Sequence, residues 1–326
     1  IESIFKKHKI FGIASICSDI SVPIISSLSK KYDLPSLNER QSDILTNKYF
    51  MKNFFKKHKV RSSSFHLYKN IFLAKKFIKK VKFPVVIKPS ISYGQKGVIK
   101  INDFKDFSKK ITSAKKFSLN KKIIIEDFVE GKEVNVVAIV YNKIPIFLSF
   151  SDRIVYKDKG FGIAYEHRYP TTVKRKKIEK IKLVVKKIVN KMNLNNVVIY
   201  PQFIINKDPQ IIEIAGRVPG GYMRDVSMLA SGIDPVKFQI LIAMQEKNIL
   251  KKIRNSKKKK SVYVKFFTNR DFKKISDIKK KNIKKAELKR GIYKIFFNNI
   301  NAIPSLKDSS SRFGVLISYG KNIKES

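Results

Sequence analysis

Hydrophobic residues in the first 45 positions follow two different spacings. Lys9–Ile16 is a mostly apolar run of strand length, whereas apolar residues in Val22–Tyr32 recur at helical spacing after an early proline. Residues 9–45 therefore predict a strand, a loop, a helix and a short strand. Such a unit is half of an α/β arrangement and would leave a sheet edge uncovered. We expect residues 1–45 to be the end of a truncated first domain, with an N-terminal part missing.

From residue 47 to residue 128 the pattern alternates between helical and strand spacing. It predicts an amphipathic helix over 47–58, strands over 83–89, 98–101 and 122–128, a polar loop over 90–97, and a helix over 103–116. The first of these strands ends at Lys88 and Pro89, directly before the polar loop.

The rest of the chain predicts further strands and a long helix. The pattern indicates a hairpin over 135–150, a helix over 178–192, strands over 197–205 and 210–214, a linker or loop at 257–260, and short strands and helices over 261–320. The helix over 178–192 has apolar residues on one face and lysines on the other, which is typical of a solvated surface helix.

Charge adds one question to this picture. The 326 residues carry a formal net charge of +46, which first suggests a nucleic acid or an anionic membrane as partner. However, arginine supplies only 11 of the 71 basic residues, although it is preferred for bidentate contacts to phosphates and bases. Lysines spread along the whole chain are typical of an AT-rich genome, and we expect no specific nucleic-acid binding.

Cysteine usage and hydropathy indicate the setting of the protein. Cys17 is the only cysteine, which excludes an intrachain disulfide and a cysteine-based zinc site. The most apolar stretch, 136–150, is interrupted by Asn142 and Lys143, so no uncharged run reaches the roughly 20 residues that span a bilayer. We expect two or three domains, no membrane partner and a reducing, cytoplasmic location.

Three segments contain residue types that nucleotide chemistry requires. In the first, Lys88 precedes a loop with Gly94 and Gly97. Glycines allow successive N–H groups to converge on an anion, and a lysine adds a mobile charge for phosphate oxygens. The Gly-Lys-Ser/Thr sequence of a P-loop is absent, so this segment predicts a different type of phosphate site.

The second segment, 123–133, concentrates acidic residues. Glu126 ends an apolar strand, and Glu133 begins the next strand after a glycine turn. A hinge of this type offers backbone donors and acceptors to an adenine edge, and a carboxylate to ribose hydroxyls. The alternative is a strand–turn–strand whose acidic side chains face solvent.

In the third segment Glu213 lies between apolar neighbours of a strand, where an unpaired carboxylate is costly. Arg217 is one candidate partner for it. A divalent metal that bridges nucleotide phosphates is the other. Gly220 and Gly221 then leave backbone N–H groups accessible to an anionic substrate.

In this order, the segments resemble an ATP-grasp ligase over nearly the whole chain. Thr46–Met51 resembles the start of the helix with the family's first nucleotide lysine, Val85–Pro89 the second lysine, Glu126–Val129 the adenine hinge, Glu213–Gly221 the metal and substrate strand, and Ser311–Gly320 the C-terminal segment of carboxylase-type and amino-acid-ligase-type members. The resemblance implies an α/β and α+β fold in which two α+β subdomains enclose ATP. Its parts are a truncated Rossmann-like segment over 1–45, an ATP-grasp module over 46–255 whose residues 82–130 clamp the nucleotide, and an α+β segment over 256–326.

The resemblance also implies roles for individual residues. It assigns nucleotide binding to Lys48, Lys88, Gly94, Gly97, Glu126, Asp127, Val129 and Glu133, metal binding to Glu213 and Gln202, catalysis to Lys88 and Arg217, and substrate binding to His167, Arg168, Gly220 and Gly221. The implied cofactors are ATP and Mg²⁺ or Mn²⁺. For His167 and Arg168 the alternative is a solvated loop, because both residue types are common at surfaces.

Two positions depart from the family. Gln202 stands where the family commonly has a glutamate as second metal ligand, and Ala215 stands where many members have asparagine. An amide oxygen coordinates Mg²⁺ but contributes less charge than a carboxylate. Weak metal binding, or a degenerate site, therefore stays open.

The chemistry implied by the resemblance is the activation of a carboxylate. ATP phosphorylates the carboxylate, and an amine then displaces phosphate from the acyl phosphate. We favour a carboxylate–amine ligase that acts on amino acids or similar small metabolites. The alternatives are a carboxylase-type member that activates bicarbonate and a degenerate ATP-binding or nucleic-acid-binding protein. The expected partners are small molecules, and a homodimer is left open.

Overall fold

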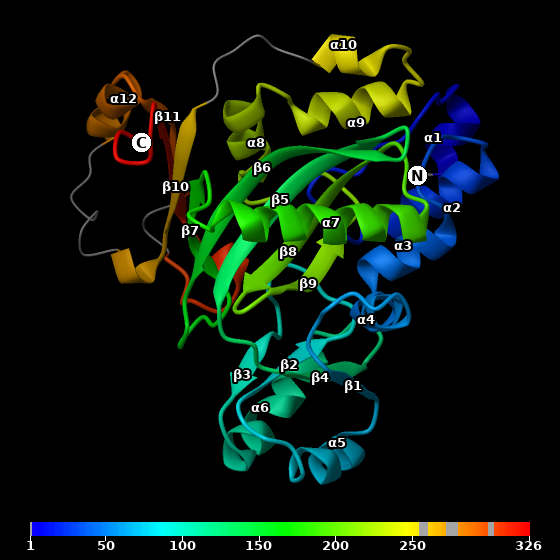
Figure 1. Cartoon of the computed structure of the whole chain (residues 1–326), viewed down its shortest axis with the longest axis vertical. Coiled ribbons are helices and arrows are strands. Elements are labelled where there is room, and N and C mark those ends of the chain that lie inside the picture. The colour runs from blue at the N-terminus through cyan, green and yellow to red at the C-terminus, as the bar shows by residue number, and fades with distance from the viewer. Residues whose placement is uncertain (1, 254–259, 272–279, 299–302) are drawn as a thin grey trace.

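The computed structural model describes residues 2–253, 260–271, 280–298 and 303–326, which form two antiparallel β-sheets and the helices packed on them (Figure 1). The smaller sheet has the order β1-β4-β2-β3 and contains β1 (Phe65–Tyr68), β2 (Val85–Pro89), β3 (Ile99–Ile101) and β4 (Ile123–Asp127). Helices α5 (Ile71–Ile78) and α6 (Phe104–Lys116) cover one face of it.

Alternation along β2 directs its side chains to two different places. Val85 and Ile87 belong to the core formed with α5 and α6. Because successive side chains of a strand point to opposite faces, Val86 and Lys88 face away from these helices, and both line a cavity. The two-residue period of the strand thus directs Lys88 into the cavity, whereas the neighbouring Val85 and Ile87 pack the sheet against α5 and α6.

The larger sheet has eight strands in the order β11-β12-β10-β7-β6-β5-β8-β9, and every neighbouring pair is antiparallel. Its strands are β5 (Lys132–Tyr141), β6 (Ile144–Val155), β7 (Ala164–Tyr169), β8 (Val197–Ile205), β9 (Pro209–Ala215), β10 (Ser261–Phe267), β11 (Ile292–Phe297) and β12 (Gly314–Gly320). The register pairs Glu133 with Arg153 and Gln202 with Glu213, so polar side chains meet across adjacent strands.

Helices cover both faces of this sheet (Figure 1). On β5, Val134 and Val136 pack with helix α7 (Arg175–Met192), whereas Val137 and Ile139 pack with residues of α8 (Met223–Ser231), α9 (Pro235–Ala243) and α10 (Ile249–Ile253). A central strand that is apolar on both faces therefore lies between two layers of helices. The apolar face predicted for residues 178–192 is confirmed, because Ile181, Val185 and Ile188 are fully buried.

The N-terminal segment differs from the prediction in two places. After α1 (Glu2–Lys7), residues 9–15 form no strand, and Ile16 makes only an isolated parallel bridge to Val218. The apolar run finds no sheet to join, and Phe11 is 62% exposed. The predicted short strand before residue 45 is also wrong, because this segment forms α3 (Glu39–Thr46) after α2 (Ser21–Lys31). A reciprocal capping box between Asn38 and Gln41 begins α3.

The helices and strands predicted between residues 47 and 214 are confirmed, with modest changes at their ends, but β1, α5 and β7 were not predicted, and β1 and α5 lie where a polar loop was expected after residue 58. Helix α4 (Lys48–Lys57) lies where the amphipathic helix was expected, and the hairpin extends over 132–155. The C-terminal part also contains three short helices between its strands. Along the chain, η1 (Asn269–Asp271) follows β10, α12 (Lys280–Glu287) precedes β11, and η2 (Ser309–Ser311) precedes β12. Of the lysine run 257–260, only Lys260 lies within the described residues, directly before β10.

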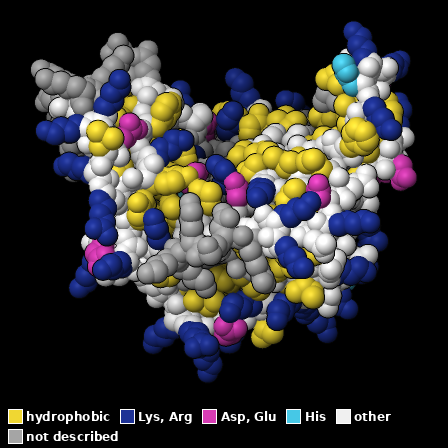
Figure 2. Space-filling view, turned by 90° about the horizontal axis from the view of Figure 1, so that it is seen from above, with side chains coloured by type: hydrophobic (Ala, Val, Ile, Leu, Met, Phe, Trp, Pro, Cys, Tyr) yellow, Lys and Arg dark blue, Asp and Glu magenta, His cyan; other side chains and the backbone are white. Residues whose placement is uncertain are grey.

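Basic side chains are widely distributed over the surface. Figure 2 shows Lys and Arg scattered with a few Asp and Glu, and the described side chains visible on this face form no continuous basic stripe. Within the residues that the structure describes, no single helix is both long and apolar enough to cross a bilayer. Only α8 and α9 together, bent by 99° at their junction, reach the required length and composition.

Candidate functional site

A cavity of about 730 Å³ is lined by residues of the small sheet, the large sheet, the N-terminal segment and the C-terminal segment. Most residues proposed from the sequence line it: Lys48, Lys88, Gly94, Glu126, Asp127, Val129, Glu133, His167, Gln202, Glu213, Arg217, Gly220 and Gly221. Two proposed residues, Gly97 and Arg168, do not line it. The fold thus brings together segments that are separated by more than half of the chain.

The two loop glycines have different surroundings. Gly94 has φ of +66°, lines the cavity, and a Cβ atom added to it would meet no atom within 4 Å. Gly97 has φ of +73°, and a Cβ atom there would lie 2.8 Å from Cγ of Pro89 and 3.1 Å from the carbonyl oxygen of Ala114. Gly97 therefore packs the loop against helix α6 and does not line this cavity, and its role in nucleotide binding stays a prediction.

Residues 164–169 form strand β7, so the alternative of a solvated loop is wrong for this part of the segment. His167 is buried and lines the cavity, and burial lowers its pKa well below the ordinary value, which keeps the imidazole neutral. Arg168 points elsewhere: its Nε donates to the Glu166 carboxylate at 3.1 Å, and its guanidinium lies 5.8 Å from the Tyr263 ring centre. Arg168 does not line the cavity, and its assignment to the substrate site stays a prediction.

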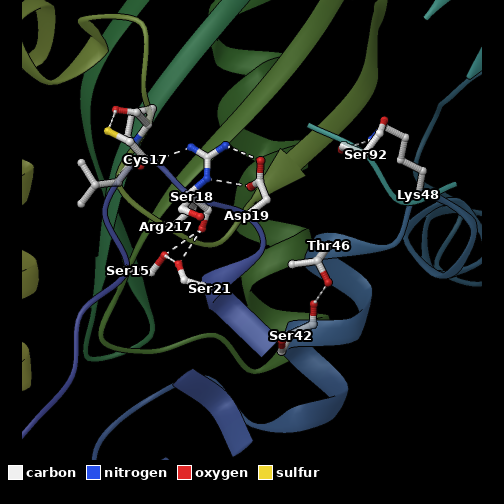
Figure 3. Close-up of polar contacts among 12 residues, drawn as sticks. Ser15, Cys17, Ser18, Asp19, Ser21, Ser42, Thr46, Lys48, Ser92 and Arg217 are labelled. Atoms are coloured by element: carbon white, nitrogen blue, oxygen red, sulfur yellow. Dashed lines mark hydrogen bonds and ion pairs between the residues drawn. The ribbon is translucent and has the colours of Figure 1, made fainter. Parts of the chain in front are cut away.

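Lys48 is the first residue of α4. The side chain of Asn47 caps this helix by accepting a hydrogen bond from the Tyr49 N–H at 3.0 Å. The Lys48 Nζ donates to the carbonyl oxygen of Ser92, 3.0 Å away in the polar loop (Figure 3). Burial is the main reason that the pKa of Lys48 is lowered, and the nearby Lys88 acts in the same direction. The lysine thus connects the helix to the loop that follows β2.

Glu126 lies between two buried lysines. Its carboxylate is 2.9 Å from Nζ of Lys52 and also forms an ion pair with Lys88. Burial opposes its ionisation, but the charges of Lys52 and Lys88 outweigh burial and lower the pKa of Glu126 to about 2. Ser63 extends the network, since Nζ of Lys52 lies 2.6 Å from its hydroxyl oxygen. The Glu126 side chain is therefore committed to two lysines, and only the backbone beyond it is available as an adenine hinge.

Lys52 was not predicted from the sequence. It is one turn after Lys48 on α4, and an i,i+4 spacing places two side chains on the same helix face. Its side chain is only 1% exposed, and burial lowers its pKa despite the charge of Glu126. The helical spacing of the two lysines was the available indication in the sequence.

Glu133 faces a guanidinium from the neighbouring strand. Its carboxylate pairs with Arg153, and Nη2 of Arg153 donates to the carbonyl oxygen of Gly162 at 2.6 Å. The cross-strand register explains the pair, because Glu133 is directly opposite Arg153. The carboxylate proposed for ribose hydroxyls is thus present at the cavity wall and held in one orientation.

Arg217 is bound to the N-terminal segment and not to Glu213. Its Nε and Nη2 atoms each lie 2.7 Å from a carboxylate oxygen of Asp19, a bidentate arrangement visible in Figure 3. Hydrogen bonds from the hydroxyls of Ser15 and Ser21 to the carbonyl oxygen of Ser18 shape the turn that presents Asp19. Arg217 therefore forms its ion pair with Asp19, and among the described residues no ion pair joins it to Glu213.

Glu213 lines the cavity, and within the described chain no side chain forms an ion pair with it. Gln202 is directly opposite on β8 and also lines the cavity. Mg²⁺ is commonly held by one or two carboxylates together with substrate phosphates and water. One carboxylate and one amide therefore fit Mg²⁺ with the smallest usual number of carboxylate ligands. Among the described residues no cluster of three His, Cys, Asp or Glu could hold a metal alone. The donor set therefore fits a metal held jointly with phosphates.

Comparisons with known proteins agree with this geometry. A model of the phosphoribosylglycinamide synthetase ATP-grasp (A) domain matches residues 46–220. A phosphoribosylamine–glycine ligase of Fusobacterium nucleatum is 25% identical over 191 residues, which are 54% of this chain and 45% of that protein. A D-alanine–D-alanine ligase of Wigglesworthia glossinidia brevipalpis is 33% identical over 119 residues, 34% of this chain and 33% of that protein. The chain spans less than half the length of these relatives in the matched regions.

Solved structures show the same fold over almost the entire chain. A phosphoribosylglycinamide synthetase from Anaerococcus prevotii superposes with a TM-score of 0.70 and 23% identity, covering 99% of this chain and 81% of that chain. An L-amino acid ligase from Bacillus licheniformis superposes with a TM-score of 0.78 and 15% identity, covering 99% of this chain and 79% of that chain. With a family match over more than half of its 326 residues, this chain belongs to the ATP-grasp family.

Proposed function

We propose that this chain is an ATP-dependent ligase that activates a carboxylate as an acyl phosphate for attack by an amine. The observation that carries the proposal is that Lys48, Lys88 and Glu213 line one cavity although they come from a helix and two different sheets. Glycine, D-alanine and L-amino acids occur in the names of the similar proteins, which supports an amino acid as one substrate.

The proposed reaction has two steps. A carboxylate oxygen attacks the γ-phosphorus of ATP, the bond to the leaving ADP oxygen breaks, and the amine nitrogen then displaces inorganic phosphate from the acyl phosphate. Lys48 and Lys88 would neutralise phosphate charge during the in-line transfer, which is the main catalytic demand of phosphoryl transfer. The backbone at residues 127–131 would contact adenine, with the Glu133 carboxylate placed for ribose hydroxyls.

In this proposal Glu213 and Gln202 would hold a magnesium or manganese ion, which when bound neutralises phosphate charge. Lys88 is held by Glu126, so its ammonium group is fixed before the nucleotide arrives. Preorganised charge of this kind costs no rearrangement at the moment of reaction. The Gly220 and Gly221 N–H groups would contact an anionic part of the substrate.

The direct test measures the release of ADP from ATP in the presence of Mg²⁺, with each member of a panel of amino acids and small carboxylates added in turn. Hydroxylamine is present as a nucleophilic trap. An acyl phosphate converts to a hydroxamate under these conditions. We expect ADP release that requires a carboxylate, with hydroxamate formed from the same compound. Release that depends on bicarbonate would support the carboxylase alternative. Nucleotide binding without turnover across the panel would indicate a degenerate member.

Replacing Gln202 with glutamate tests the metal assignment. The variant Gln202→Glu supplies a second carboxylate opposite Glu213. We expect it to bind Mn²⁺ more tightly in the presence of ADP, by about tenfold, which corresponds to about 1.4 kcal/mol. Titration followed by the electron paramagnetic resonance of free Mn²⁺ measures this affinity. Gln245→Glu, at an exposed glutamine that does not line the cavity, is the control, and an equal gain in both variants would contradict the assignment.

The domain limits, the location and the oligomeric state also remain proposals. We place the ATP-grasp module at 46–255 and the C-terminal segment at 256–326, although β10, β11 and β12 join the same sheet as β5–β9. A cytoplasmic location and a homodimer fit a metabolic ligase, and light scattering coupled to size-exclusion chromatography measures the latter.

A further inference from the structure

The cations that line the cavity differ in what neutralises them. Lys88 shares Glu126 with Lys52, Arg153 pairs with Glu133, and Arg217 is bound by Asp19. Arg312, from the segment before β12, also lines the cavity. Throughout the described chain, no carboxylate lies within 4 Å of its guanidinium. Its positive charge is therefore not paired with a carboxylate among the described residues.

Arg312 is nevertheless held in a defined place. Its Nε donates to the carbonyl oxygen of Ser309 at 2.8 Å, and its guanidinium carbon lies 4.1 Å from the Phe266 ring centre. Stacking on an aromatic ring stabilises a guanidinium and leaves its outer N–H groups free to donate. Burial, followed by the charge of Arg153, lowers the pKa of Arg312 to about 10, so the group stays protonated at neutral pH.

The guanidinium lies beside the glycine pair. Nη1 of Arg312 is 4.0 Å from the position that a Cβ atom on Gly221 would occupy, and both Gly220 and Gly221 line the cavity. The cation is thus next to backbone that a side chain does not cover. His167 also contacts Phe266: the centres of the two rings are 5.5 Å apart and the rings meet edge to face.

We propose that Arg312, beside Gly221, holds an oxyanion of the second substrate, either a carboxylate or a phosphate group. An unpaired and partly desolvated guanidinium is costly, and a bidentate oxyanion offsets this cost. Arg217 already donates from Nε and Nη2 to Asp19 and from Nη1 to the carbonyl oxygen of Val218. Three lysines that line the cavity, Lys48, Lys100 and Lys157, also have no carboxylate partner in the described chain. Lys48 contacts the loop at Ser92 and Lys100 lies over the Phe128 ring next to the hinge, which places both on the nucleotide side, and Lys157 is exposed. This inference rests on the proposed function, because it concerns a substrate of the same cavity.

The test is isothermal titration calorimetry of the full chain with inorganic phosphate and, separately, with acetate. Each titration is made on protein saturated with ADP and Mg²⁺ and on nucleotide-free protein. We expect one of the two anions to bind the ADP-saturated protein, and Arg312→Gln to weaken it by at least about tenfold. The affinity for ADP should stay unchanged, and Arg312→Lys should retain part of the binding. Inorganic phosphate is also a product of the proposed reaction. Phosphate binding that Arg312→Gln weakens in the nucleotide-free protein as well would therefore identify a phosphorylated substrate, and tighter acetate binding a carboxylate.

Arg270→Gln is the matched control. Its guanidinium also stacks on an aromatic ring, 4.3 Å from the Tyr156 ring centre, but it is paired with Asp158 and lies outside this cavity. Equal anion binding by Arg312→Gln and the wild type, or no anion binding at all, would overturn the proposal. Loss of ADP affinity in Arg312→Gln would also overturn it. If the wild type fails to bind ADP, the proposed function fails, while the nucleotide-free titration still decides the role of Arg312.

Discussion

Replacing Lys88 with alanine is expected to lower the rate of ATP-dependent ADP release by about 10³-fold while the chain remains folded. The Lys88 ammonium is buried at the end of β2, lines the cavity and is oriented by Glu126. Removal of the Lys88 ammonium takes away a fixed positive charge next to the phosphate oxygens, on which negative charge develops during the phosphoryl transfer. Water cannot replace that charge without reorganising. A coupled assay for ADP at saturating ATP measures the loss.

Two features make this result interpretable. Lys52, 2.9 Å from the Glu126 carboxylate, is not changed by Lys88→Ala, so we expect this carboxylate to stay paired and the fold to survive. Lys109→Ala is the matched control, because Lys109 is an exposed lysine on α6 of the same part of the chain and does not line the cavity. A circular-dichroism melt verifies folding of both variants. Full activity of Lys88→Ala would contradict the assignment of Lys88 to the nucleotide site.

The elements that position the site could be predicted because their patterns are local. The strand that ends in Lys88, the hairpin after Glu133 and the strand around Glu213 each have an apolar period that specifies strand over a few residues. The resemblance of these motifs, in this order, to those of ATP-grasp ligases then implied that they share one nucleotide site. In the structure Lys48, Lys88 and Glu213 line one cavity.

Pairing between distant residues could not be predicted, since it depends on the tertiary fold. Asp19 and Arg217 are 198 positions apart, so no spacing in the sequence connects them. Arg312 follows a run of serines and becomes notable only when Phe266 and Gly221 lie beside it. The apolar run before Cys17 predicted a strand, yet strand formation needs a neighbouring edge, and this segment reaches one only at Ile16.

Replacing Glu126 with alanine is expected to lower the free energy of unfolding by about 3 to 5 kcal/mol at neutral pH. The change leaves the buried Lys52 and Lys88 side by side without their shared counter-charge. Removing one member of a buried ion network exposes the others to an uncompensated desolvation cost. Urea unfolding followed by circular dichroism measures the difference. Glu179→Gln, an exposed glutamate on α7 paired with Lys182, is the control and should show no measurable change.

Acid distinguishes this explanation from a simple loss of packing. The pKa of Glu126 is lowered from 4.5 to about 2 in the folded chain, so the folded carboxylate binds fewer protons than the unfolded one in that interval. Its contribution, about 3 kcal/mol, is therefore fully present above pH 4.5 and is lost as the pH falls towards 2. The gap in unfolding free energy between wild type and Glu126→Ala should narrow over this range. A gap that stays constant from pH 7 to pH 3 would mean that Glu126 stabilises the fold by its shape and not by its charge.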